Sequence, residues 1–272
     1  MSFQPVVPIG GLAGLRLLDA TAERQLDTFS RRPDIQRAAD AFITRAGEIT
    51  SAEELVADRE LLSVALSAFG LEDEINKRAL IRRVLEEGTL DPDSLANKLV
   101  DPAWRRFSET LGLDFGNRLV LGDVRREVAD AFVERQFERA VGDQDVNLRL
   151  ALNFRREIET VAGEPGVERA GWFRVIGSEP LRRVVFGALG LPDSFGALDV
   201  DAQADRLSER ARQVFGGDSP AIFTDASVRE DAVSRFLLRA EAEAGLGAGG
   251  GTLGGGALGG GAIANLILSG IG

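Results

Sequence analysis

The chain has 272 residues, enough for one large domain or two small ones with a sizeable core. It contains neither cysteine nor histidine, which excludes disulfides, thiolate nucleophiles and zinc–thiolate or iron–sulfur sites and removes the commonest general base. The net charge of −11 argues against nucleic acid and acidic lipid headgroups as partners, because both attract clustered cations. We therefore expect no enzyme activity, no cofactor and no metal site.

The first residues, MSFQPVVPIGGLAGLRLL, are apolar, but they lack the basic start of a signal peptide. Pro5 and Pro8 also interrupt the run. We expect residues 1–20 to form an N-terminal arm, flexible or docked on a partner, and not a cleavable signal peptide. No stretch approaches the ~18 continuous apolar residues of a membrane helix, so we expect no integral membrane segment.

Nearly every segment between residues 21 and 244 has the pattern of a helix. Val124, Val128 and Phe132 recur at helical spacing, and Phe154 and Ile158 do so further along the chain. Alternating strand patterns with Asn-Gly or Asp-Gly hairpin turns are missing. The sequence predicts an all-α fold, an irregular multi-helix bundle. We expect one helical domain over 21–244, with 21–113 and 114–244 as candidate submodules.

Local capping signals predict several helix starts. TSAEELV offers Thr50 as an N-cap with Glu53 three residues later, the spacing of a capping box. Asp91 and Asp101 are each followed by proline, which is tolerated at the first helical position. We expect helices to begin at these three places.

The helix ending Gly-Leu occurs three times, in LSVALSAFGL, WRRFSETLGL and RRVVFGALGL. Glycine adopts the left-handed region without a Cβ penalty, so Gly70, Gly112 and Gly190 are predicted to be helix C-caps. Each following leucine should fold back into the core. The spacings of 42 and 120 residues are unequal, which argues against a solenoid. Duplication of a helical module and coincidental reuse of a common cap remain equal alternatives.

Residues 245–272 form a Gly-rich apolar tail, with thirteen of the 32 glycines and no charged residue. Glycine at this density costs too much backbone entropy to fold alone, so one interpretation is a disordered end. The other is a segment that orders against a partner or another copy of the chain. Its candidate interaction residues are Ile263, Leu266, Ile267, Leu268 and Ile271.

Motifs that suggest a ligand fail on inspection. GLGAGGG lacks the preceding strand and the lysine of a nucleotide-binding loop. The segments starting at Asp143 and Asp199 lack the sixth-position glycine and twelfth-position glutamate of a calcium loop, and we interpret them as polar helix starts. In WRRF, Trp104 and Phe107 share a helix face and should point inward. The acidic run in LEDEI, residues 71–75, is expected to complement the dipole of the next helix.

Residues 50–113 carry, in order, a leucine-rich helix ending in AFGL, then IRRVLEEGT, LANKL, and Asp-Pro followed by an aromatic residue and RRF. These blocks resemble a bacterial family of proteins of unknown function, and weaker similarity extends over positions 24–191. Genes of that family commonly lie within flagellar gene clusters, particularly in alphaproteobacteria. Trp104 departs from the family, which more often has tyrosine there. No catalytic residues are established for the family, so the resemblance assigns none here.

The resemblance implies a non-enzymatic, flagellum-associated structural or interaction protein that contacts a flagellar component or another copy of itself. A chain without cysteine also suits export in unfolded form by the flagellar route. The alternative is a cytoplasmic adaptor or export chaperone for a flagellar component. A hydrolase that uses two carboxylates is a remote alternative.

Overall fold

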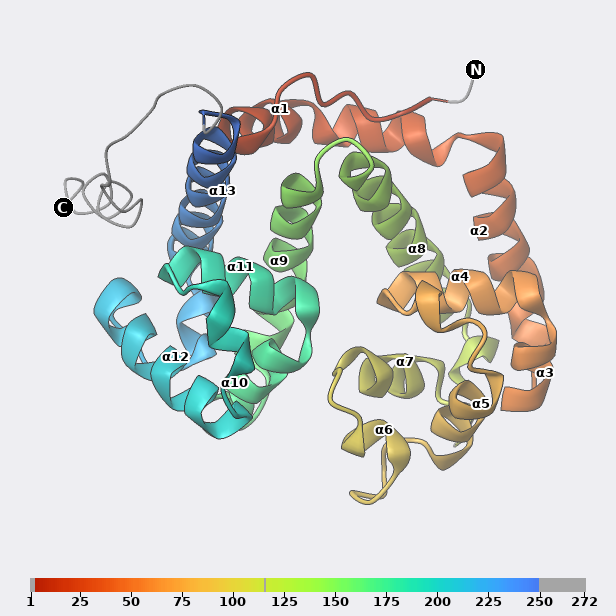
Figure 1. Ribbon diagram of the computed structural model, residues 1–272. Helices are drawn as coiled ribbons and strands as arrows, with labels where there is room; N and C mark the ends of the chain where they lie inside the picture. Colours follow the sequence, from red (N-terminus) through yellow and green to blue (C-terminus); the bar gives the residue numbers. More distant parts are fainter. Residues whose placement is uncertain (1–2, 115, 250–272) are drawn as a thin grey trace. The chain divides into compact units, whose positions relative to one another are not determined.

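The computed structural model describes residues 3–114 and 116–249. These residues form thirteen α-helices joined by short loops and 3-10 turns, and they contain no strand (Figure 1). The predicted all-α fold is confirmed. Within the same residues, no helix is both long and apolar enough to cross a membrane.

The chain divides into two compact units. Unit 1 comprises Met1–Val7 and Leu17–Gln144, and unit 2 comprises Pro8–Arg16 and Asp145–Gly272. The expected division after residue 113 is wrong, because the following long helix packs on the N-terminal helices and belongs to unit 1.

Unit 1 is centred on α4, which packs against α2, α7 and α8. Phe42 of α2, Leu62 of α4 and Val128 of α8 are completely buried in its core. Its helices after the N-terminal segment are α2 (Pro33–Arg45), α3 (Ala52–Ala57), α4 (Arg59–Phe69), α5 (Arg78–Glu87), α6 (Leu95–Lys98), α7 (Ala103–Leu111) and α8 (Gly122–Gly142). The 3-10 turns η1 (Ala46–Glu48), η2 (Glu72–Glu74) and η3 (Arg118–Val120) connect them.

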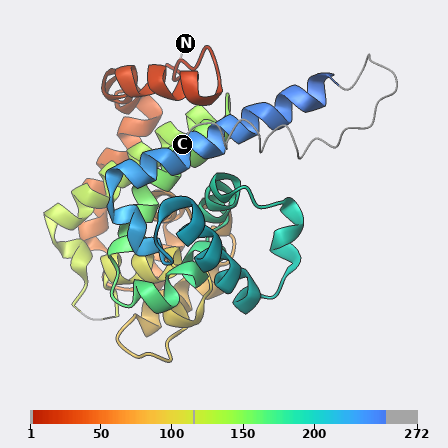
Figure 2. The ribbon, with the colours of Figure 1, turned by 90° about the vertical axis from the view of Figure 1, so that its left-hand side faces the viewer.

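Unit 2 is centred on α11, which packs against α9, α10 and α13. Figures 1 and 2 show α13 as its longest helix. The close approach of α11 and α13 depends on Gly187, because a β-carbon there would lie 2.7 Å from Phe236 Cδ2. The helices are α9 (Val146–Gly163), α10 (Val167–Gly177), α11 (Glu179–Leu189), α12 (Val200–Phe215) and α13 (Ala226–Gly249), with the turns η4 (Asp193–Ala197) and η5 (Pro220–Thr224).

The two units share one order of packed elements. In unit 1, α2, α4 and α8 pack on one another, and α3 packs on both α4 and α5. In unit 2, α9, α11 and α13 pack on one another, and α10 packs on both α11 and α12. A 3-10 turn precedes and contacts the last helix of each set, η3 before α8 and η5 before α13. Helices α6 and α7 have no counterpart in the described part of unit 2, so they form an insertion in unit 1.

The expected N-terminal arm is wrong over its second half. Helix α1 spans Gly11–Ser30, and Leu15 and Leu18 are almost completely buried. The start of α1 belongs to unit 2, where the Leu12 N–H donates to Glu241 Oε1 of α13 at 3.1 Å. This carboxylate accepts one of the amides that a helix leaves unpaired at its first turn.

The structure places each of the three predicted helix starts differently from the prediction. Helix α3 is capped by Ser51, whose hydroxyl accepts from the Glu54 N–H, and Glu54 accepts from the Thr50 N–H. The predicted Thr50–Glu53 box is therefore one residue off. Asp91 caps a turn and no helix, since α6 starts only at Leu95. Asp101 accepts from the Ala103 N–H at 2.8 Å, but the N-cap of α7 is Pro102 and the helix starts at Ala103, one residue later than predicted.

The expected tail falls mostly outside the described residues. Helix α13 continues to Gly249, so the tail's first five residues are helical. The candidate interaction residues Ile263, Leu266, Ile267, Leu268 and Ile271 lie beyond the part of the chain that the structure describes.

Candidate functional site

All three Gly-Leu endings close a helix with a left-handed glycine, at φ of +75° for Gly70, +56° for Gly112 and +68° for Gly190. At Gly190 the glycine N–H donates to Gly187 O at 3.1 Å and the Leu191 N–H to Phe186 O at 2.9 Å. The same pair of bonds closes α4 at Gly70. Both endings are Schellman motifs, whereas Gly112 donates to Ser108 O in the simpler αL pattern.

This difference separates the two explanations for the repeated ending. Gly70 and Gly190 end α4 and α11, which are the equivalent central helices of the two units. Gly112 ends α7, which lies in the insertion. The equivalent places of the first and third copies are those that duplication would give, whereas the second copy ends a helix that has no counterpart in the described part of unit 2.

The leucines after the glycines have different environments. Leu71 is buried, with 3% of its surface exposed, as predicted. Leu113 and Leu191 are only half-buried, so the prediction is wrong for them. Leu191 is half-buried because it lines two surface pockets of unit 2.

An arginine packs over each of the three glycines. A β-carbon on Gly70 would lie 2.6 Å from Arg135 Nη1, and one on Gly190 would lie 2.9 Å from Arg239 Nη1. Over Gly112, Arg118 packs and donates to Glu109 O at 3.1 Å. A guanidinium at a helix C-terminus meets the negative end of the helix dipole. Glycine is thus favoured at these positions by the left-handed backbone, and an added β-carbon would also displace the arginine.

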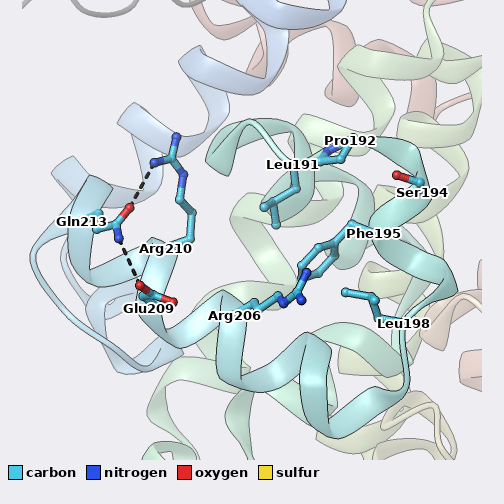
Figure 3. A pocket seen from close by; sticks show the side chains of 9 residues that line it. All are labelled: Leu191, Pro192, Ser194, Phe195, Leu198, Arg206, Glu209, Arg210 and Gln213. Atoms are coloured by element: carbon cyan, nitrogen blue, oxygen red, sulfur yellow. Dashed lines mark hydrogen bonds between the residues drawn. The ribbon is translucent and has the colours of Figure 1, made fainter.

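The first pocket lies between η4 and α12 and has a volume of about 390 Å³ (Figure 3). Phe195 and Leu198 supply apolar surface, and Phe195 packs edge-on against Phe186 with ring centroids 4.9 Å apart. Arg206 and Arg210 supply its positive charge. Arg210 is held in place, since its Nε donates to Leu189 O at 3.0 Å at the end of α11.

The second pocket has a volume of about 360 Å³ and lies between α11 and α13. It shares Leu191 and Pro192 with the first, so the two pockets flank the same loop. Phe186 and Phe236 give it aromatic walls. Its cations are Arg182, Arg183 and Arg239, of which Arg239 pairs with Glu243 at 2.9 Å.

Five arginines and two glutamates line the pair of pockets, although the chain as a whole carries a net charge of −11. Arg183 and Arg206 are exposed and form no hydrogen bond or ion pair with the described residues. Guanidinium groups beside aromatic surface are suited to carboxylates, which they bind through paired hydrogen bonds. The lining of the two pockets thus combines aromatic surface with an excess of positive charge.

The remaining acidic motifs of the sequence serve as helix caps or form ion pairs. Asp145 and Asp199 are N-caps of α9 and α12, as the interpretation of polar helix starts predicted. The acidic run of residues 72–74 forms η2, where Glu72 and Glu74 pair with Arg139 and Lys77. It lies four residues before α5 and does not sit at that helix's first turn. In the described ranges, no group of three or more acidic side chains is placed to hold a metal ion.

Five of the described carboxyl groups have pKa values below their ordinary range. The pKa of Glu87 is lowered by its hydrogen bond from Arg83 and then by the Leu95 N–H, and the pKa of Asp218 is lowered by Arg212. Asp34, Glu54 and Asp225 shift the same way through similar bonds. A general acid needs the opposite shift, so these groups act as acceptors in caps and ion pairs.

A family of proteins of unknown function, DUF1217, matches residues 68–224, which is more than half of the chain. The protein belongs to the DUF1217 family. The match runs from the last turn of α4 to the end of η5, so it includes Gly70, Gly190 and the lining of the first pocket. The α13 residues that line the second pocket lie beyond it. It also overlaps the segment 50–113 that carries the sequence resemblance.

A crystal structure of a protein from Agrobacterium tumefaciens is similar to this DUF1217 chain, with a TM-score of 0.73 and 24% sequence identity. The alignment covers 89% of this chain and 99% of that chain. At this identity the likeness shows the fold alone. No protein of curated function matches the sequence.

Proposed function

We propose that this DUF1217 protein is a non-enzymatic, flagellum-associated interaction protein that holds an acidic segment of a protein partner at the two pockets flanking Pro192. The binding role rests on the charge of the site. Arginines from α11, α12 and α13 line the two pockets, although the chain as a whole is acidic. Two of them have no partner among the described residues. The resemblance of residues 50–113 supports the flagellar association.

The proposal includes export by the flagellar route, with the chain acting at or near the assembled structure. Absence of cysteine supports this, because thiols could cross-link outside the cell. The alternative is a cytoplasmic adaptor or export chaperone that uses the same pockets on one client. Acidic segments recur among soluble proteins, so the pockets fit either role.

The first experiment measures the protein in washed cells, culture supernatant and purified flagella, in parallel with a strain whose flagellar export is blocked. Appearance outside the cell only when export works supports an exported component. Retention in the cytoplasm under both conditions favours the adaptor. Equal release from both strains overturns the export route.

The second experiment tests the pockets. The double variant Arg183→Glu with Arg206→Glu reverses the two unpaired arginines. Arg59→Glu with Arg78→Glu is the matched control, because these exposed arginines begin α4 and α5 in unit 1. We expect the pocket variant to lower binding of a labelled oligoglutamate peptide about tenfold at low salt, and the control to leave it unchanged. Equal loss in both variants would indicate a general effect of net charge.

A further inference from the structure

A short non-helical segment, residues 3–7, is held on unit 1 by side chains that bind its backbone; we call it the strap. The Val6 N–H donates to Gln25 Oε1 at 2.6 Å, and Gln25 Nε2 donates back to Val6 O at 3.3 Å. One glutamine amide thus makes the pair of bonds that a neighbouring peptide group would make in a sheet.

A second glutamine holds the strap in the same way. Gln144 Nε2 donates to Pro5 O at 2.6 Å, and its Oε1 accepts the Val7 N–H at 3.4 Å. Arg32 Nη1 donates to Phe3 O at 3.2 Å. All of these bonds bind the strap's main chain, which is how a receptor for an extended peptide gains affinity.

The side chains that receive the strap are also held by contacts outside it. Gln25 Nε2 also donates to Thr21 Oγ1 at 2.8 Å, and Arg32 is fixed by Asp34 at 2.7 Å and by the ring of Phe29. Pro5 is buried, whereas the side chain of Val6 is 58% exposed. A groove of about 360 Å³ remains between the strap and the α1 residues from Leu17 to Thr28.

We infer that this receptor exchanges its occupant, so that it binds residues 3–7 of a second copy of the chain and joins the copies in a strap-swapped dimer. The chain's own strap is the segment already seen to fit, and every contact can be repeated between copies. Exchange of an identical element is a low-cost route to a dimer. The connection Pro8–Gly10 to α1 is exposed and non-helical, which allows the strap to leave.

The short connection between the strap and α1 determines the protein concentration at which exchange occurs. A short linker gives an attached segment an effective concentration in the millimolar range, so dilute chains keep their own strap. Exchange requires copies at comparable local concentration. This inference stands on the strap contacts and is independent of the flagellar assignment and of the pockets in unit 2.

Cross-linking between two single-cysteine chains tests the exchange, because the parent chain contains no cysteine. One chain carries Gln4→Cys in the strap, and the other carries Arg24→Cys in the groove of α1; both residues are exposed. Arg82→Cys on α5 is the control, since Figure 1 places α5 away from the strap in unit 1. We expect a short bismaleimide to join Gln4→Cys to Arg24→Cys increasingly as concentration rises, and not to Arg82→Cys.

Two further variants identify the contacts. Gln25→Ala and Gln144→Ala each remove a pair of hydrogen bonds from the closed and the exchanged form alike, so they should speed exchange severalfold and leave the final intermolecular yield nearly unchanged. Their melting temperatures confirm that both remain folded. The inference is overturned if the chains stay monomeric at all concentrations while the double variant Gln4→Cys with Arg24→Cys cross-links only internally. Equal products with Arg24→Cys and Arg82→Cys would also overturn it, since they indicate unspecific association.

Discussion

Unit 1 and unit 2 arrange equivalent helices around the same type of helix ending, but they differ beside it. In unit 1, α7 packs on α4 and α5, and Phe107 lies edge-on between Phe69 and Trp104. In the described part of unit 2, α11 and α12 have no such cover, and the pockets open beside them. The proposed binding surface of unit 2 therefore lies beside helices whose equivalents in unit 1 are covered by the insertion.

The largest expected effect contrasts the two faces directly. Phe107→Ala should destabilise unit 1 by about 4 kcal/mol, because this ring is completely buried and leaves a cavity. Phe195→Ala should cost only about 3 kcal/mol, since its site adjoins an open pocket that water can enter. Urea unfolding of each variant measures both values. A cost for Phe195→Ala as large as that for Phe107→Ala would contradict the contrast.

The next effect tests the arginines over the glycines. Gly70→Ala, Gly112→Ala and Gly190→Ala should each lower the free energy of unfolding by about 2 kcal/mol, from backbone strain and displacement of an arginine. Gly216→Ala is the control, because Gly216 ends α12 at φ +84° with nothing within 4 Å of an added β-carbon. It should cost about 1 kcal/mol. Unchanged melting in all three variants would remove their assignment as helix caps.

A smaller effect separates the two arginines on the pocket face of α12. Arg210→Ala should cost about 1 kcal/mol, since it removes the hydrogen bond to the last carbonyl of α11. Arg206→Ala should change stability by less than about 0.5 kcal/mol, because Arg206 is exposed and unpaired among the described residues. Thermal melting distinguishes them. Equal losses would mean that Arg210 is not a capping residue.

The smallest effect is a pH dependence at Glu87, the last residue of α5, which accepts from the first residue of α6. Hydrogen bonds from Arg83 and the Leu95 N–H lower the pKa of Glu87 below its ordinary value of 4.5. Its stabilising contribution is therefore complete above that pH and is lost as the pH falls through the lowered pKa. Glu87→Gln should lower the melting temperature slightly at pH 7, and the difference from the parent should shrink as the pH falls below 4.5 and through the lowered pKa. A difference that grows on acidification would contradict the assignment.

Local signals explain how much of the fold could be predicted from the sequence. The Asp145 and Asp199 caps and the glycine helix endings depend on residues within one turn, so they can be recognised without tertiary information. The Thr50–Ser51 pair offered two adjacent caps and the prediction chose the wrong one. Asp91 failed because Asn97 Nδ2 donates to Thr89 O and Asp91 O, which holds a turn where a helix was expected.

Features that depend on packing could not be predicted. The pocket arginines Arg183, Arg206 and Arg239 come from three helices, and nothing in the spacing of those residues brings them together. The division after Gln144 depends on which helices α8 packs against. The binding of the strap also depends on packing, because Gln25 and Gln144 are far apart in the sequence and come together only in the folded unit.

The carboxylate of Glu241 that caps the start of α1 has a consequence for biosynthesis. A ribosome completes Leu12 long before it reaches Glu241, so α1 must wait for its acceptor while almost the entire chain is made. Residues 17–144 are continuous and can assemble in the meantime. The second unit closes only when its two separated pieces have both emerged from the ribosome. A nascent chain stalled before residue 241 should therefore have a protease-resistant first unit and an uncapped, protease-sensitive start of α1.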